Sequence, residues 1–166
     1  MDQEDAFADV LASNDEYVAQ FQLAGLEPIA GRGLAVLTCM DSRIEPLAML
    51  GLAPGDAKIV RNAGARVTDD VLRTFFVARY LLGVERIMVV AHTRCRMAGQ
   101  TEQEIHEAIR AAGGPDTEGL TFLVASDQLK ALREDVERAR SRPYLGGIAI
   151  GGFLYDVDTG RLSQLC

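Results

Sequence analysis

The stretch "ERIMVVAH", residues 85–92, decides the fold class of this chain. Its residues 87–91 are all apolar, with no polar residue alternating between them. Such a run is typical of a strand that is buried on both faces, as strands are in a parallel sheet. A second apolar run, "LAVLTC" at 34–39, precedes it, and a helix-like segment, "VTDDVLRTFFVARYLLG" at 67–83, lies between the two runs. Strands that alternate with helices predict an α/β fold with a mainly parallel central sheet and flanking helices.

The other elements follow outward from these runs. Apolar residues at roughly helical spacing predict one or two amphipathic helices over 5–26, within an N-terminal helical segment of about residues 1–30. Thr101 and Glu104 have the spacing of a capping box at a helix start, and Pro143 ends another helix. The "DTG" turn predicts a hairpin over 146–165, and hence an antiparallel strand at the sheet edge. We also expect strands at 57–64 and 120–125, and helices at 44–52, 101–114 and 126–143.

Composition restricts the class of protein. The 166 residues are 48% hydrophobic and 25% charged, which predicts one globular domain over residues 1–166. A net charge of −7 argues against a binder of nucleic acid or of anionic membranes and favours a small-molecule or protein partner. The sequence has no run of 18 apolar residues and no basic-then-apolar leader at its N-terminus. We therefore expect a cytoplasmic protein.

The cysteines indicate where the chemistry lies. Cys39 ends the first apolar run, while His92 and Cys95 follow the second, so a parallel sheet brings all three to one edge. Two thiols and an imidazole are good zinc ligands, and a free fourth position is typical of catalytic zinc. For Cys39 alone, a small hydrophobe in the core is the plainer interpretation. Cys166, the last residue, is expected to be exposed and frayed.

The two motifs also resemble those of a known family. "CMDSR" at 39–43 and "HTRC" at 92–95 are similar to the Cys-x-Asp-x-Arg and His-x-x-Cys motifs of the β-class carbonic anhydrases, in particular the short bacterial type. The similarity extends through "RNAG" at 61–64 and "GFLYDVDTGRL" at 152–162. It implies reversible hydration of carbon dioxide to bicarbonate, with zinc held by Cys39, His92 and Cys95. It also implies a homodimer, or a dimer of dimers, with active sites at the dimer interfaces.

The resemblance further implies a catalytic pair, Asp41 and Arg43. A carboxylate beside the metal can orient the attacking oxygen, provided that a guanidinium holds the carboxylate away from the ion. If that ion pair breaks, Asp41 becomes a fourth metal ligand and closes the site. The backbone N–H of Gly64 is a candidate donor to bicarbonate, although a plain turn glycine explains this residue equally well.

Two arginines depart from the family pattern. Arg94 stands where the family usually has an acid, and Arg96 where it usually has a glycine. We expect both cations to lower the pKa of Cys95 and to attract anions, or Arg96 to strain the backbone or fill the pocket. Other interpretations stay open: a hydrolase of carbonyl sulfide or carbon disulfide on the same scaffold, or a non-catalytic protein that binds zinc or an anion. Thiol redox chemistry is less favoured because there is no Cys-x-x-Cys motif.

Overall fold

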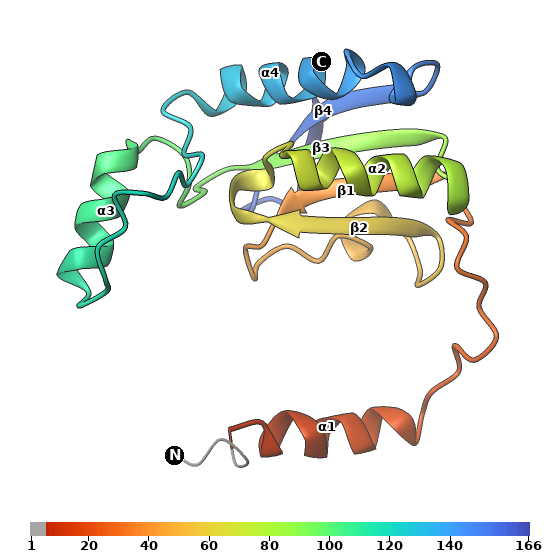
Figure 1. Cartoon of the computed structure of the whole chain (residues 1–166). Helices are drawn as coiled ribbons and strands as arrows, with labels where there is room; N and C mark the ends of the chain where they lie inside the picture. The colour runs from red at the N-terminus through yellow and green to blue at the C-terminus, as the bar shows by residue number, and fades with distance from the viewer. Residues whose placement is uncertain (1–5) are drawn as a thin grey trace.

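A computed structural model describes residues 6–166, which form a twisted sheet with helices around it (Figure 1). The sheet has the order β2-β1-β3-β4-β5. Strands β1 to β4 run parallel, and β5 pairs antiparallel with β4 at the edge. This arrangement confirms the predicted fold class. The strands are β1 (Leu34–Cys39), β2 (Ala57–Asn62), β3 (Arg86–His92), β4 (Ala149–Tyr155) and β5 (Leu162–Gln164).

The two apolar runs are the central strands of this sheet. All six residues of β1 are buried, and so are the last four of β3. The strands pair in register from Leu34 opposite Arg86 to Thr38 opposite Val90. Because parallel strands in register end side by side, Cys39 and His92 lie together at the end of the sheet where the carboxyl ends of these strands meet.

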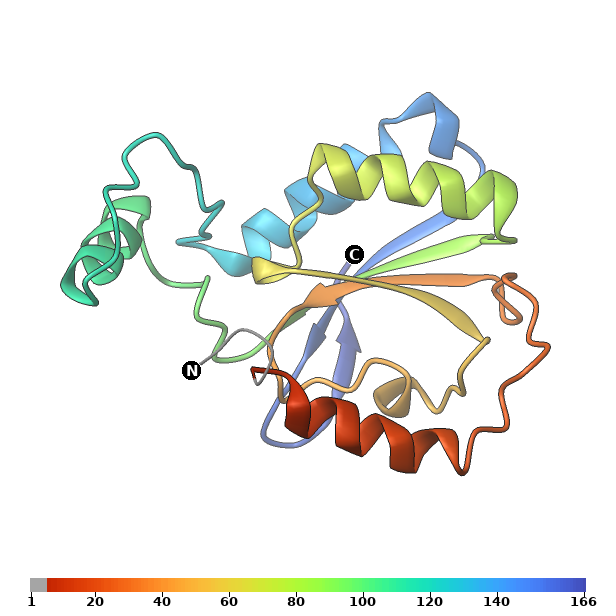
Figure 2. The same cartoon turned by 60° about the horizontal axis from the view of Figure 1, so that its bottom comes forward.

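Two helices cover one face of the sheet, as Figure 2 shows. They are α2 (Asp69–Leu81) and α4 (Gln128–Arg140). The side chain of Thr68 caps α2 by accepting a hydrogen bond from the N–H of Val71 at 3.3 Å. Side chains of both helices, such as Phe75 and Val136, pack with Leu37 of β1 in the main hydrophobic core. This packed layer fixes the strands whose ends form the site.

The N-terminal segment forms less helix than expected. It contains a single helix, α1 (Ala8–Val18), and the chain continues without helix from there to β1; residues 1–5 lie outside the described part. No residue of α1 is buried, and Figure 1 shows the helix well apart from the sheet. The helix expected over 44–52 is reduced to one 3₁₀ turn, Ala48–Leu50. None of the described helices has the length and apolarity needed to cross a membrane.

The strand expected over 120–125 is wrong. This segment follows α3 (Glu102–Ala111) on an excursion away from the sheet (Figure 1). The carboxylate of Glu102 accepts the backbone N–H groups of Phe122, at 2.8 Å, and Val124, at 3.1 Å. The β-pairing of the segment is limited to an isolated bridge, Ala98 to Ala125. A side chain therefore takes the hydrogen bonds that a neighbouring strand would have taken, and β4 is the fourth parallel strand instead.

Candidate metal centre

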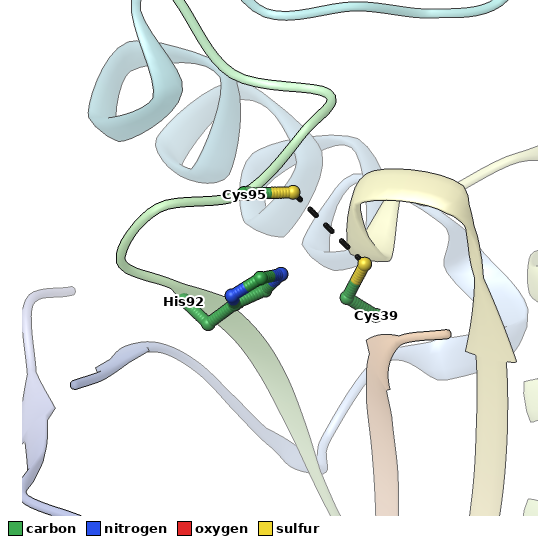
Figure 3. Close-up of side chains that lie close together, drawn as sticks. All are labelled: Cys39, His92 and Cys95. Atoms are coloured by element: carbon green, nitrogen blue, oxygen red, sulfur yellow. Dashed lines mark hydrogen bonds between the residues drawn. The ribbon is translucent and has the colours of Figure 1, made fainter. Parts of the chain in front are cut away.

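Three potential metal ligands converge where β1 and β3 end. Cys39 is the last residue of β1, His92 the last of β3, and Cys95 follows three residues later. All three are buried, and their ligand atoms lie within 4.8 Å of one another. Figure 3 shows the two thiols and the imidazole facing one another, with the Sγ atoms 4.0 Å apart. The structure thus brings together the three residues that the sequence predicts as ligands.

The donor set fits a tetrahedral metal ion such as zinc. Two thiolates at 2.3 Å from such an ion lie about 3.8 Å apart, close to the separation observed here. Nδ1 of His92 lies 2.9 Å from the carbonyl oxygen of Thr93, so Nδ1 carries the proton and Nε2 is free to bind a metal. Nε2 is buried and has no hydrogen-bond partner in the structure. A buried imidazole nitrogen without a partner is costly unless an ion satisfies it.

The two thiols affect one another's ionisation. A hydrogen bond from Cys95 lowers the pKa of Cys39 to about 4, although burial opposes this shift. The same contact raises the pKa of Cys95. The expectation that Arg94 and Arg96 lower the pKa of Cys95 is therefore wrong, because the closer Cys39 sulfur dominates. The thiolate is the form that binds metals, so the lowered pKa favours the ligand form of Cys39, whereas Cys95 would have to release its proton when an ion binds.

Asp41 and Arg43 form a closely fitted ion pair beside this cluster. Arg43 donates from Nε to Oδ1 of Asp41 at 2.9 Å, from Nη2 to Oδ2 at 2.7 Å, and from its backbone N–H to Oδ1 at 3.0 Å. These hydrogen bonds hold the pKa of Asp41 below its ordinary range. Oδ2 of Asp41 lies only 3.8 Å from Nε2 of His92, so the carboxylate borders the position that a metal would take. The predicted ion pair is present; its catalytic role stays a prediction.

Arg61 is a residue at this site whose role the sequence reasoning missed. Its Nε donates to the carbonyl oxygen of Cys39 at 2.9 Å, and its Nη2 donates to that of Asp41 at 2.6 Å. One guanidinium thereby fixes the backbone on both sides of Met40. A charged residue near the carboxyl end of the β2 run was the available signal, since a fork of donors suits two neighbouring carbonyl groups.

Comparison with known proteins places the chain in a family. A sequence model described as carbonic anhydrase matches residues 34–114. β-Carbonic anhydrase 1 of Mycobacterium tuberculosis is 32% identical over 160 residues, which cover 95% of this chain and 96% of that protein. This chain belongs to the β-carbonic anhydrase family. The crystal structure of a carbonic anhydrase from Streptococcus mutans agrees, with a TM-score of 0.88 and 37% identity over 96% of this chain and 97% of that one.

Proteins named carbon disulfide hydrolase are also similar to this chain. A carbon disulfide hydrolase from an Acidianus strain is 34% identical over 157 residues. The match covers 80% of this chain and 77% of that hydrolase.

Gly64 lies directly beside the candidate metal ligands. Its backbone N–H donates to Sγ of Cys39 at 3.4 Å. The φ angle of Gly64 is +79°, and a Cβ atom there would come within 3.1 Å of the Cβ of Met97. Both features explain why this position carries a glycine. The amide contacts the sulfur of a candidate ligand, and its contact with bicarbonate stays a prediction.

The structure differs from the expectations for the two unusual arginines in backbone conformation and in the pairing of Arg94. Arg94, and not Arg96, has a left-handed backbone conformation, with φ +53°. The guanidinium of Arg94 pairs with the carboxylate of Asp158 in the β4–β5 turn. It is therefore not free to attract anions to the site, as the sequence reasoning expected of it.

The third cysteine lies away from the cluster. Cys166 is half-buried, and its carbonyl oxygen accepts the N–H of Gly152 at 2.9 Å. A Cβ atom on Gly152 would meet the Cys166 sulfur at 2.6 Å, so the thiol occupies space that the glycine leaves free. The expectation of a frayed, exposed Cys166 is wrong, because β5 carries the last residues of the chain back along β4.

Proposed function

We propose that this protein is a zinc-dependent enzyme that reversibly hydrates carbon dioxide to bicarbonate. One observation carries the proposal: a carboxylate fixed by three hydrogen bonds from Arg43 lies 3.8 Å from the unpartnered nitrogen of His92. A purely structural metal site has no use for an ionised acid held beside its fourth position. A catalytic site needs that position open, with a hydrogen-bond acceptor next to it.

Each residue of the site has a defined task in this proposal. Cys39, His92 and Cys95 hold the ion through two sulfurs and one nitrogen. When bound there, zinc would act as a Lewis acid and lower the pKa of a water molecule on it to near neutrality. Asp41 accepts a hydrogen bond from the attacking group and so orients it toward the carbon of the substrate.

Arg43 and Arg61 keep Asp41 in place. Arg43 keeps the carboxylate ionised and turned away from the ligand cluster, because a bidentate guanidinium fixes both carboxylate oxygens. Arg61 fixes the main-chain carbonyls of Cys39 and Asp41 and so keeps the backbone between these two residues from moving toward the metal position. Should Arg43 be lost, Asp41 would be free to rotate toward His92 and close the site.

The proposal is tested by metal analysis combined with stopped-flow hydration of carbon dioxide. We expect one zinc per chain and turnover that disappears when a chelator removes the metal. Cys39→Ser and Cys95→Ser should each lose zinc, whereas Cys166→Ser, which changes a thiol outside the cluster, should retain zinc and activity. Zinc-loaded wild-type protein without hydration activity would overturn the proposed function.

Hydrolysis of carbon disulfide or carbonyl sulfide is a second candidate. The 34% identity to the Acidianus carbon disulfide hydrolase favours it. Both reactions need the same water-activating centre, so the rates with the two classes of gas distinguish them. Sulfide release that exceeds bicarbonate formation by a hundredfold at equal substrate concentration would transfer the proposal to the hydrolase.

We further propose that the chain assembles as a homodimer, or a dimer of dimers, and that α1 contributes to the contact. Five large apolar side chains on and beside α1 are more than half exposed in the single chain: Phe7, Val10, Leu11, Tyr17 and Val18. A second copy would remove this surface from water. Sedimentation should show a dimer that dissociates in the Val10→Asp, Leu11→Asp double variant. Ser13→Asp, at an exposed polar position of the same helix, is the control; a monomeric wild type would contradict the proposal.

A further inference from the structure

The turn that joins β4 to β5 is fastened to the loop that follows β3. The backbone N–H of Thr93 donates to the carbonyl of Tyr155 at 2.9 Å, and the hydroxyl of Thr93 accepts the N–H of Val157 at 3.1 Å. The guanidinium of Arg94 adds an ion pair with the carboxylate of Asp158. Three successive contacts therefore join this loop, which leads to Cys95, to the turn at the sheet edge.

The main chain of Arg94 in turn touches the Asp41–Arg43 pair. Nη2 of Arg43 donates to the carbonyl oxygen of Arg94 at 3.2 Å. The same Nη2 donates to Oδ2 of Asp41 at 2.7 Å. The direction of the Arg94 carbonyl thus limits where the Arg43 guanidinium can lie, and the guanidinium determines where the carboxylate lies.

The backbone of Arg94 needs external support for this direction. With φ at +53°, Arg94 has a left-handed conformation, which costs a residue with a Cβ atom about 1–2 kcal/mol. Such a conformation persists only where the surroundings impose it. The hydrogen bonds of Thr93 hold one side of Arg94, and the Asp158 carboxylate holds its side chain.

We propose that Arg94 and Asp158 are positioning residues for the Asp41–Arg43 pair. Their ion pair keeps the Arg94 carbonyl directed at Arg43, and so keeps Arg43 from releasing Asp41 toward the metal ligands. This inference rests on the proposed role of Asp41 beside a bound metal. It assigns a function to the arginine that stands where an acid was expected.

Contribution to stability is the alternative explanation, and the surroundings of the pair argue against it. The side chains of Arg94 and Asp158 are 60% and 57% exposed, and ion pairs this exposed add about 0–1 kcal/mol to stability. The turn also keeps its shape by other means. The carboxylate of Asp156 accepts the N–H groups of Asp158, at 2.8 Å, and Thr159, at 3.2 Å. Removing the Asp158 carboxylate therefore leaves the turn in place but frees the Arg94 side chain.

The test uses the full-length protein loaded with zinc for kinetics and with cobalt for spectroscopy. Asp158→Ala removes the partner, and Arg94→Asn removes the cation with a residue that tolerates the left-handed conformation. The Arg94→Asp, Asp158→Arg double variant restores an ion pair with reversed polarity. Asp70→Asn breaks another exposed arginine–aspartate pair, Arg73–Asp70 on α2, and is the matched control.

The readouts are kcat, the thermal midpoint and the affinity of azide for the cobalt protein, measured from its visible spectrum. Azide competes with Asp41 for the fourth position, so it reports the direction of the carboxylate without turnover. In Asp158→Ala and Arg94→Asn we expect kcat to fall and the azide dissociation constant to rise, each about 3- to 10-fold. The thermal midpoint should match that of the control, and the double reversal should recover most of the loss.

Unchanged azide affinity in both single variants would overturn the inference. A fall in thermal midpoint that accounts for the lost activity would overturn it as well. The azide measurement decides the matter even where carbon dioxide is not the substrate. Failure of the proposed function would appear separately, as an inactive wild type.

Discussion

Arg43 donates three hydrogen bonds of 2.7 to 3.0 Å to the carboxylate of Asp41, two from its side chain and one from its backbone. We predict that Arg43→Ala releases the carboxylate toward the metal position and lowers hydration activity about 100-fold while zinc stays bound. Arg43→Lys keeps the charge but not the bidentate geometry, so its activity should lie between those of the wild type and Arg43→Ala. Stopped-flow rates and zinc content of both variants check this. Near wild-type rates in Arg43→Ala would reduce the pair to a structural contact.

Arg61 should matter almost as much, although it touches no predicted ligand side chain. Arg61→Met keeps the length of the side chain but removes both donors to the carbonyls of Cys39 and Asp41. We predict a fall of about 10- to 100-fold in activity, as expected for residues that orient metal ligands through hydrogen bonds without touching the metal. Arg61→Lys can reach one carbonyl and should be affected less. Equal loss in the two variants would indicate that both carbonyl contacts are needed together, whereas full activity in Arg61→Lys would indicate that charge, and not carbonyl orientation, is what Arg61 supplies.

Gly64 offers a test of the contact between its amide and the Cys39 thiol. Gly64→Ala introduces a Cβ atom at 3.1 Å from Met97 and should shift the amide away from the Cys39 sulfur. Gly113 has the same φ of +79° with no atom near its Cβ position, so Gly113→Ala imposes the backbone strain alone. We predict that both variants lose about 1–2 kcal/mol of stability, and that only Gly64→Ala also binds zinc more weakly. Metal competition with a chromogenic chelator measures this; equal zinc affinities would remove Gly64 from the site.

The Asp41–Arg43 pair also predicts a pH dependence of stability. Arg43 lowers the pKa of Asp41 in the folded protein, while in the unfolded chain the group titrates near its ordinary value of about 3.9. The ionised pair therefore stabilises the fold fully above that ordinary value, and its contribution is lost as pH falls below it. Urea unfolding of wild type and Asp41→Asn should give curves of stability against pH that run parallel from pH 7 to about 5 and converge below about 4. A constant difference down to pH 3 would contradict the assignment.

The parallel sheet and its ligand cluster were accessible from the sequence for one physical reason. Strands buried on both faces leave uninterrupted apolar runs, and the residues that end such runs must meet at one edge. Cys39 and His92 are identified by that rule alone. The capping box at Thr101 and Glu104 is equally local, and the structure contains both of its hydrogen bonds.

What the sequence could not reveal depends on contacts between distant residues. The apolar run at 120–125 has the composition of a strand, but the carboxylate of Glu102, about twenty residues away, takes its amides. Arg94 and Asp158 lie 64 residues apart, and nothing around either residue indicates the other. The sequence also did not reveal how short α1 is, because the spacing of apolar residues over 5–26 agrees equally well with a longer helix.

The separation of the metal ligands has a consequence for the life of the protein in the cell. Cys39 and Cys95 are 56 residues apart and meet only when β1 and β3 are paired, so an unfolded chain presents no comparable site. In the zinc enzyme proposed above, metal binding and folding would be thermodynamically linked, and each tenfold rise in free zinc above the dissociation constant would add about 1.4 kcal/mol to the stability of the native state. Zinc starvation would accordingly increase the unfolded fraction that proteases remove. The supply of the ion would thus set the amount of enzyme as well as its activity.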